Sequence, residues 1–397
     1  MGVQVNDARR LPHLAARMAF IEPFEVMEIQ TLAREVEAQG RDVIHLEIGE
    51  PDFRTPAPIV EAARRALLDK PMFYTSALGL IELREAISRF YAARYGVQVP
   101  ASRIVVTAGS SAALLLACGV LMDAGDEVLL TDPGYPCNRH IVGALGGAPR
   151  LIPVGPESRY QINAALARRQ WSGRTRIAMV ATPSNPTGTM VTAAEVAELA
   201  TLTREKGATL LVDEIYHGLV YDGAAPHTAA AAGDDVFVIN SFSKYFQMTG
   251  WRLGWMVAPP GYVREVEKLA QNLYISPTTV AQHAALACFE PATIEIVEQR
   301  RAELDARRKF LIPALESLGF KVPVVPQGAF YIYADSSALA PDSFQLARRI
   351  LTEAGVAVTP GKDFGHHEPQ KHIRIAYTQP VARLEEAAAR MGKLLAR

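Results

Sequence analysis

The chain has 397 residues and a mass of 43.2 kDa, more than one hydrophobic core usually organises, so two substructures are expected. Hydrophobic residues make up 49% and charged residues 21%, which is typical of a globular protein and excludes extended disorder. The 41 lysines and arginines nearly balance the 42 aspartates and glutamates, so no strong field draws the chain to nucleic acid or to an anionic membrane. These values favour a small-molecule ligand.

The cysteines and the apolar runs indicate where the protein works. The three cysteines have neither the spacing of a metal site nor that of a disulfide framework, so we expect reduced thiols and no metal. No apolar run approaches the roughly 20 residues that a membrane-spanning helix needs, and the first residues lack the apolar stretch of a signal peptide. We therefore expect a cytoplasmic protein without membrane contact.

Short apolar runs alternate with longer helix-patterned stretches between about residues 45 and 285. The runs are 104–107, 128–131, 151–154, 177–181, 210–213, 236–239 and 253–257. This rhythm predicts an α/β fold, with a large domain built on a mostly parallel seven-stranded sheet covered by helices. In open sheets of this kind, ligands bind beyond the carboxyl ends of the strands, where several polar residues of this sequence fall.

The pattern changes near residue 290 to a charged amphipathic stretch over 293–318, then to strand-like 329–333 and 373–377. This indicates a smaller α+β domain. The helix-patterned segment 21–39 is expected to pack on that domain, after which the chain bends near 49–52. The predicted organisation is an N-terminal arm over 1–19, a large cofactor-binding domain over 46–286, and a small domain made of 20–45 and 287–397.

Lys244 lies in Ser241-Phe-Ser-Lys244, directly after the strand-like run 236–240 and eight positions before Arg252. A lysine nucleophile must be uncharged to attack a carbonyl, which requires a partly desolvated site or a neighbouring cation. An aldehyde cofactor captures such an amine. A solvated lysine at a strand end is the ordinary alternative, and the neighbouring motifs decide against it.

Asp213 closes the apolar run 210–213, where a buried carboxylate would be costly unless a cation paired with it. A protonated pyridine nitrogen is such a cation, although a helix N-cap would also explain the residue. Tyr216, three residues later, and Asn185 could both reach the phenolic oxygen of the same ring. Together with Lys244, these residues predict a pyridoxal phosphate site.

A phosphate needs several donors and a fixed positive charge, best supplied by a helix N-terminus and a guanidinium. The turn before the helix-patterned 112–121 offers amides and hydroxyls, from Gly109, Ser110 and Ser111, unless these serve only as a helix cap. The remaining candidates follow the later strand and are Ser241, Ser243 and Arg252.

Arg374 lies in the alternating run 372–377, where its side chain points away from the flanking isoleucines. Its guanidinium matches a substrate α-carboxylate, a contact of about 1.5–3 kcal/mol, although an exposed strand arginine is the alternative. Tyr135 is a candidate to stack on the cofactor ring, or else an aromatic residue of a turn.

These residues resemble the fold type I pyridoxal phosphate enzymes, specifically the class I/II aminotransferases of the aspartate aminotransferase type, from about residue 20 onward. The motifs occur in the family's order and are Gly49-Glu-Pro-Asp-Phe53, Tyr74 with Gly79 and Leu83-Arg84, Asn185-Pro-Thr-Gly188, Asp213-Glu-Ile-Tyr216, Ser241-Phe-Ser-Lys244, Gly250-Trp-Arg-Leu-Gly254 and Arg374. The resemblance implies that Lys244 holds pyridoxal 5'-phosphate and moves the substrate proton. It also implies that Asp213 pairs with the pyridine nitrogen while Asn185 and Tyr216 tune the phenolic oxygen.

The same resemblance implies an activity, transfer of an amino group from an L-amino acid to a 2-oxo acid by a ping-pong mechanism. Arg374 would grip the α-carboxylate with the backbone of Gly49, and the bond between Asn185 and Pro186 would be cis. Tyr74 would reach the phosphate of a neighbouring subunit's cofactor, which implies a homodimer. The donor stays open among aromatic, branched and acidic amino acids, because Tyr135 and Ser111 differ from the tryptophan and lysine of aspartate-preferring relatives.

Three other functions share parts of this pattern. A pyridoxal phosphate-dependent β-lyase (C–S lyase) would need the same lysine, aspartate and arginine. The spacing of Ser241 and Lys244 also matches the serine acylases of the penicillin-binding type, but their partner motifs are absent. A cofactor-binding transcription sensor would need a DNA-binding domain, for which the residues before Ile21 leave no room.

Overall fold

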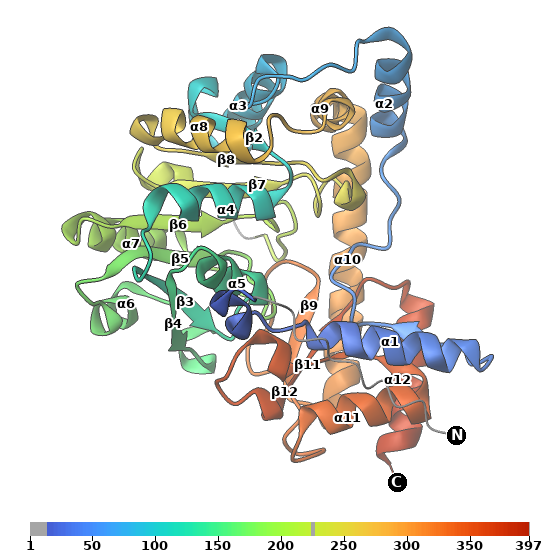
Figure 1. Cartoon of the computed structure of the whole chain (residues 1–397). Helices are drawn as coiled ribbons and strands as arrows, with labels where there is room; N and C mark the ends of the chain where they lie inside the picture. Colours follow the sequence, from blue (N-terminus) through green and yellow to red (C-terminus); the bar gives the residue numbers. More distant parts are fainter. Residues whose placement is uncertain (1–13, 224–226, 397) are drawn as a thin grey trace.

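The computed structural model describes residues 14–223 and 227–396 (Figure 1). Its largest feature is a seven-stranded sheet, whose order is β2 (Ile104–Thr107), β8 (Gly254–Val257), β7 (Phe237–Ser241), β6 (Thr209–Asp213), β5 (Thr175–Ala181), β3 (Glu127–Asp132) and β4 (Ala148–Pro153). All neighbouring pairs are parallel except those of β8, which runs antiparallel to β2 and β7. The seven strands and the mostly parallel sheet that the sequence predicts are therefore confirmed.

Both faces of this sheet are buried, which explains why its strands read as continuous apolar runs. Leu130 packs in a core with α4 (Ser110–Leu121) and α8 (Val263–Leu273). Its neighbour Leu129 packs in a second core with α3 (Ile81–Tyr95) and α7 (Ala193–Glu205). Because successive strand side chains point to opposite faces, each strand contributes to both cores.

The capping residues show why one of these helices starts where it does. Thr192 accepts a hydrogen bond from the backbone N–H of Glu195 at 3.2 Å, and the Glu195 carboxylate accepts one from the N–H of Thr192 at 2.8 Å. This reciprocal pair satisfies two of the otherwise free donors at the start of α7. The other helices of the large sheet's surroundings are α2 (Ala57–Asp69), α5 (Pro136–Ala144), α6 (Ala164–Gln170) and α9 (Thr279–Ala285).

The C-terminal residues build a second, smaller unit of strands and helices below the large sheet in Figure 1. Its three-stranded antiparallel sheet has the order β11 (Thr359–Pro360), β12 (His372–Ala376) and β9 (Tyr331–Asp335). The helices around it are α10 (Pro291–Ser317), α11 (Ser343–Arg349) and α12 (Val381–Leu395). The predicted amphipathic helix over 293–318 and both predicted strands are thus present.

Residues from the beginning of the chain lie against this C-terminal unit. Helix α1 (Glu25–Ala38) starts four residues after the predicted 21–39 and contacts β10 (Val356–Ala357) and β11. Strand β1 (Ile44–His45) pairs with β10 in parallel. Of the predicted arm over 1–19, residues 1–13 lie outside the described residues, and Ala16–Phe20 forms a short 3₁₀ helix.

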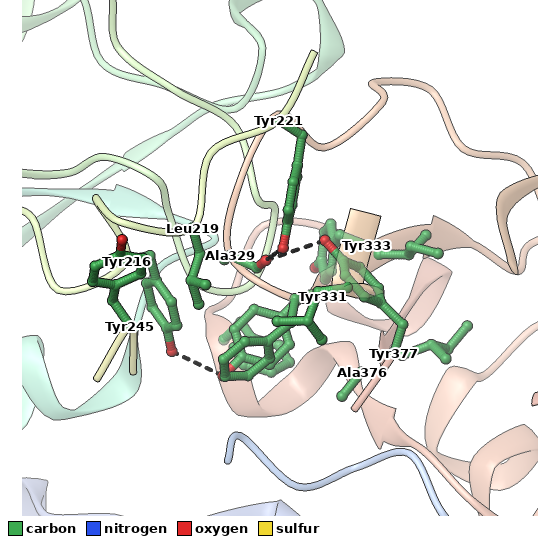
Figure 2. Packing of buried hydrophobic residues seen from close by; sticks show 14 of the residues in the cluster. Tyr216, Leu219, Tyr221, Tyr245, Ala329, Tyr331, Tyr333, Ala376 and Tyr377 are labelled. Carbon is green, nitrogen blue, oxygen red and sulfur yellow. Dashed lines mark hydrogen bonds between the residues drawn. The ribbon is translucent and has the colours of Figure 1, made fainter. Parts of the chain in front are cut away.

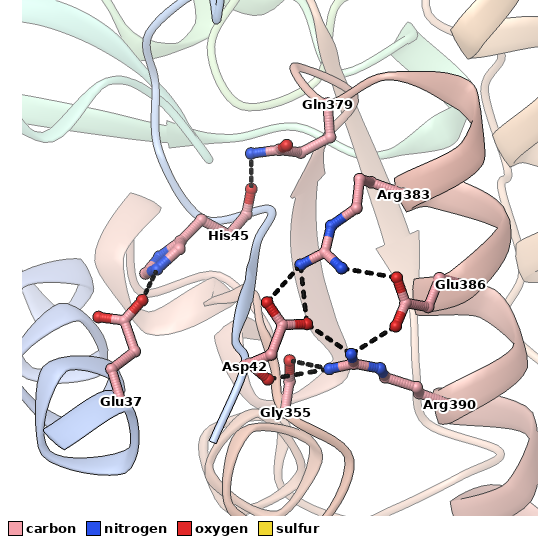
Figure 3. A network of polar contacts seen from close by, with 8 residues as sticks. All are labelled: Glu37, Asp42, His45, Gly355, Gln379, Arg383, Glu386 and Arg390. Carbon is pink, nitrogen blue, oxygen red and sulfur yellow. Dashed lines mark hydrogen bonds and ion pairs between the residues drawn. The ribbon is translucent and has the colours of Figure 1, made fainter. Parts of the chain in front are cut away.

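A polar network holds the segment before β1 to the last helix (Figure 3). Asp42 accepts hydrogen bonds from Arg383 at 2.8 Å and from Arg390 at 2.5 Å, and both arginines are on α12. His45 Nε2 lies 3.1 Å from Glu37 of α1. His45 Nδ1 lies 2.8 Å from Glu47, and this hydrogen bond raises the pKa of His45 to about 9 against the effect of burial. The protonated histidine therefore links α1 to the segment around Glu47, which lines a cavity between the two units.

Candidate active site

A cavity of about 320 Å³ lies where the carboxyl ends of the parallel strands face the C-terminal unit. It brings together residues from distant parts of the sequence. Most of the residues predicted to form the site line it, namely Gly49, Ser110, Ser111, Tyr135, Asn185, Asp213, Tyr216, Ser243, Lys244, Arg252 and Arg374.

Lys244 follows β7 and is half-buried, with its amine donating a hydrogen bond to the backbone carbonyl of Gly49 at 2.6 Å. The pKa of Lys244 is lowered to about 8, mainly by burial and also by the charges of Arg374 and Arg252, whereas Glu50 acts in the raising direction. The share of uncharged amine near neutral pH, which a nucleophile and base requires, is therefore larger than for an ordinary lysine.

Asp213 ends β6 and is 5% exposed. Burial raises its pKa to about 7, partly offset by the hydrogen bond that the Ile215 amide donates to its carboxylate at 3.0 Å. The value of about 7 also includes a raising effect from Glu214, the next residue, and a lowering effect from Lys244. A buried carboxyl in this state fits a cationic partner such as a protonated pyridine nitrogen.

Two buried tyrosines meet across the boundary between the large sheet and the C-terminal unit (Figure 2). The hydroxyl oxygens of Tyr216 and Tyr331 are 2.9 Å apart, and burial raises the pKa of Tyr216. Tyr331 lines the cavity but was not predicted as a site residue. The sequence predicts the strand-like run 329–333 that contains it, but the contact with Tyr216, 115 positions away, leaves no local signal.

Arg374 on β12 is 5% exposed, so the alternative of an exposed strand arginine is wrong. It donates hydrogen bonds to the Asn185 side-chain oxygen at 3.0 Å, to the Glu47 carbonyl at 2.6 Å and to the Thr359 hydroxyl at 3.2 Å. Its guanidinium carbon lies 4.4 Å from the ring centroid of Tyr331. These contacts fix the guanidinium at the cavity wall, where its geometry fits a carboxylate.

The Asn185 side chain thus faces Arg374 from the loop after β5, and the bond from Asn185 to Pro186 is cis, as the resemblance implied. Tyr135 lines the same cavity, and burial, the largest cause, raises the pKa of its hydroxyl.

Helix α4 begins at the cavity directly after Gly109, which has a φ of +82°. A Cβ at Gly109 would lie 2.7 Å from Nη2 of Arg252, so the missing side chain leaves room for the guanidinium. The Ser241 hydroxyl donates a hydrogen bond at 2.9 Å to the hydroxyl of Ser243, which lines the cavity. Backbone amides at a helix N-terminus, an arginine and a serine hydroxyl form a donor set that fits a phosphate.

Gly109 and Ser241 thus do not line the cavity but lie next to Arg252 and Ser243, which do. Tyr74, by contrast, is apart from the cavity. Tyr74 lies between α2 and α3 and is 79% exposed, next to Phe73, which is 77% exposed. Within a single chain Tyr74 is not brought to the site.

One wall of the cavity consists of residues that the sequence does not indicate as part of the site. It is formed by the start of α1 and by the turn after β11, and its members are Phe24, Val26, Met27, Gln30, Asp363 and Phe364. Asp363 is 338 positions from Glu25, whose backbone amide it binds, so neither spacing nor composition could indicate this contact.

The described ranges, 14–223 and 227–396, contain neither a membrane-spanning helix nor a metal cluster. No helix there is long and apolar enough to cross a membrane, and no group of three His, Cys, Asp or Glu residues is placed to hold a metal ion.

Comparisons with known proteins agree with this geometry. The family model described as aminotransferase class I and II matches residues 41–391. A valine–pyruvate aminotransferase of Mycobacterium tuberculosis is 38% identical over 382 residues, which cover 96% of this chain and 98% of that protein. An aspartate/prephenate aminotransferase of Thermus thermophilus is 34% identical, with 97% and 99% covered.

Solved structures give the same result. The crystal structure of an aminotransferase from Mycobacterium tuberculosis superposes with a TM-score of 0.94 at 38% identity and covers 97% of this chain and 100% of its own. A single mutant of the Thermus thermophilus aspartate aminotransferase gives a TM-score of 0.91 at 33% identity, with 97% and 100% covered.

The chain belongs to the class I and II aminotransferase family, with the fold type I architecture that the sequence predicts. It is an aminotransferase that depends on pyridoxal 5'-phosphate. The β-lyase and serine acylase alternatives are not favoured, since the relatives are named as aminotransferases and the Ser241 hydroxyl is engaged in the turn after β7.

Proposed function

We propose that the protein transfers the amino group of an L-amino acid to a 2-oxo acid in two half-reactions at the cavity around Lys244. The observation that carries this proposal is the arrangement of three groups around one cavity: an amine of lowered pKa, the buried carboxyl of Asp213 and the fixed guanidinium of Arg374. Bound pyridoxal 5'-phosphate supplies an electron sink for the charge that develops when the substrate Cα loses its proton.

Each residue then has a role that follows from its position. Lys244 binds the cofactor and, when released, moves the proton at the substrate Cα. Asp213 keeps the pyridine nitrogen protonated, and Asn185 and Tyr216 donate to the phenolic oxygen. The remaining contacts hold the ligands in place: Tyr135 stacks on the ring, the backbone of Gly49 and Arg374 bind the α-carboxylate, and Gly109, Ser110, Ser111, Ser241, Ser243 and Arg252 surround the phosphate.

The proposed domains are a large cofactor-binding domain over 46–286 and a small domain over 20–45 and 287–397. Supporting this division, Asp42 binds Arg383 and Arg390 of α12, and β1 pairs with β10. The small domain supplies Arg374, so its position relative to the large domain sets where the substrate lies.

We also propose a homodimer in which Tyr74 reaches the phosphate site of the partner subunit. The support is the high exposure of Tyr74 and Phe73, two large side chains that a surface loop would otherwise leave in water. A role in amino acid metabolism in the cytoplasm fits the free cysteines, of which Cys118 and Cys288 are buried thiols.

The visible absorbance of the purified protein tests the proposed function. Single amino acids are added without any 2-oxo acid, and the cofactor band should shift from the visible to the ultraviolet as the amino group is transferred. A 2-oxo acid added afterwards should restore the band. If the band persists while ammonia and pyruvate accumulate, the enzyme is a lyase; if no band forms with added cofactor, Lys244 does not have the proposed role.

A further inference from the structure

We propose that the cavity selects amino acids with uncharged, apolar side chains, and that Asp363 is the residue that rejects a second carboxylate. This inference rests on the proposed aminotransfer and concerns the end of the cavity that receives the substrate side chain. It specifies the donor class that the sequence left open.

The charges that line the cavity provide the first argument. Among the described residues, its cations are Lys244, Arg252 and Arg374. Each has a task in the proposed reaction: cofactor attachment, phosphate binding and α-carboxylate binding. No further lining cation is therefore available within the described chain for the second carboxylate of a dicarboxylic donor.

The second argument is the character of the wall formed by the start of α1 and the turn after β11. Four of its side chains, Phe24, Val26, Met27 and Phe364, are apolar, and the cavity lining also includes the apolar Ile48, whereas Gln30 and Asp363 are the polar members of the wall. A carboxylate placed against the apolar side chains would lose water without gaining a partner, whereas an aliphatic or aromatic side chain would bury apolar surface.

Asp363 is the charged member of this wall. It is 4% exposed and accepts a hydrogen bond from the backbone amide of Glu25, the first residue of α1, at 3.0 Å. Burial, the largest cause, raises the pKa of Asp363, and the positive charge of Arg374 lowers it. Asp363 and Arg374 both line the cavity, so the ionised carboxyl of Asp363 adds negative charge to the space that receives the substrate.

The same residue positions the apolar wall. Through the Glu25 amide, Asp363 holds the start of α1 at the cavity, where Phe24 and Met27 contribute to the lining. Outside the cavity, Lys362 makes an ion pair with the Glu25 side chain at 2.6 Å and is 64% exposed. The two links have the same target on α1, but only Asp363 carries its charge into the cavity.

Binding of unreactive analogues to the cofactor-loaded enzyme tests the proposal without turnover. The probes are 4-methylpentanoate, an apolar monocarboxylate, and maleate, a dicarboxylate, with dissociation constants measured from the thermal shift. We expect the wild type to bind 4-methylpentanoate at least about 10-fold more tightly than maleate, since like charges oppose each other in the cavity. Asp363→Asn keeps an oxygen for the Glu25 amide but loses the charge, and should reduce this ratio by about 10-fold.

Lys362→Gln is the matched control, because it weakens the other link to α1 without changing a lining residue. Its ratio should equal that of the wild type. The proposal is overturned if the wild type binds maleate as tightly as the monocarboxylate, a comparison that needs no variant, or if Lys362→Gln shifts the ratio as Asp363→Asn does. If the enzyme transfers amino groups but prefers aspartate as donor, only the proposed selectivity is overturned. If no amino acid changes the cofactor band, the proposed aminotransferase reaction itself is overturned.

Discussion

The two ionisable groups at the centre of the site are both held away from their ordinary protonation. Burial raises the pKa of Asp213 to about 7 and lowers that of Lys244 to about 8. Each charged form is therefore disfavoured in the folded chain without the cofactor. A cationic ring nitrogen bound next to Asp213 would stabilise its carboxylate. Cofactor binding is therefore expected to remove a free-energy cost that the cofactor-free site imposes on the folded protein.

This arrangement makes the stability of the cofactor-free protein depend on pH. The folded-state pKa of Asp213 lies above its ordinary value of 3.8, so its ionisation costs stability from about pH 4 upward and costs most above about pH 7. Asp213→Asn removes this cost. We expect the variant without cofactor to gain on the order of 3 kcal/mol in unfolding free energy at pH 8 and less than about 1 kcal/mol at pH 4.

Urea unfolding at the two pH values measures this difference. Asp222→Asn is the control, because a hydrogen bond from Arg308 lowers the pKa of Asp222, so its loss should give no gain at pH 8. An equal gain for Asp213→Asn at both pH values would contradict the explanation. With cofactor bound, the same variant should turn over about 10²–10³-fold more slowly, because the charge that develops is no longer stabilised.

The turn between β2 and α4 shows how one element depends on a missing side chain. Gly109 has a φ of +82°, and a Cβ there would meet Arg252 at 2.7 Å. Gly109→Ala should therefore both strain the backbone and displace the guanidinium. We expect the dissociation constant of the cofactor to rise about 10-fold, the equivalent of one weakened charge-assisted hydrogen bond.

Gly125 provides a control, because it has a similar left-handed backbone conformation but no atom close to the position of a Cβ. Its φ is +86°, and nothing lies within 4 Å of the position of a Cβ. Both variants should lose about 1 kcal/mol of stability from the left-handed conformation, but only Gly109→Ala should weaken the cofactor. Equilibrium dialysis and thermal unfolding separate the two effects, and equal cofactor affinity in both variants would show that Arg252 does not depend on this turn.

Whether the active site is complete in one chain depends on the oligomeric state of the protein. Within the chain, Tyr74 is exposed and apart from the cavity around Lys244. In the proposed dimer, a subunit with Lys244→Ala paired with one carrying Tyr74→Ala would contain one intact site and one site with both changes. We therefore expect a mixture of these two weakly active variants to regain activity after the subunits exchange.

Activity after mixing, set beside the dimer content from sedimentation velocity, measures this complementation. Two separately prepared Lys244→Ala samples mixed together are the control and should stay inactive. If the mixed variants form dimers without recovering activity, Tyr74 serves its own subunit or no site at all.

The arrangement of strands and helices could be read from the sequence because it depends on local patterns. All seven predicted strands of the large sheet are present, as is the amphipathic helix α10. The motifs around Lys244, Asp213 and Arg374 were also recognisable, since each stands at the end of or within an apolar run. Burial of such runs and the chemistry of one side chain are properties of a few neighbouring residues.

Other features depend on residues that meet only after folding. Tyr331 reaches Tyr216, and Asp363 reaches the start of α1, from more than a hundred positions away in each case. The pKa values of Lys244 and Asp213 likewise depend on burial by several separate segments. The amino-acid order thus contains the reaction type in its motifs, whereas the shape and charge of the substrate pocket arise from contacts between distant segments, which no spacing along the chain encodes.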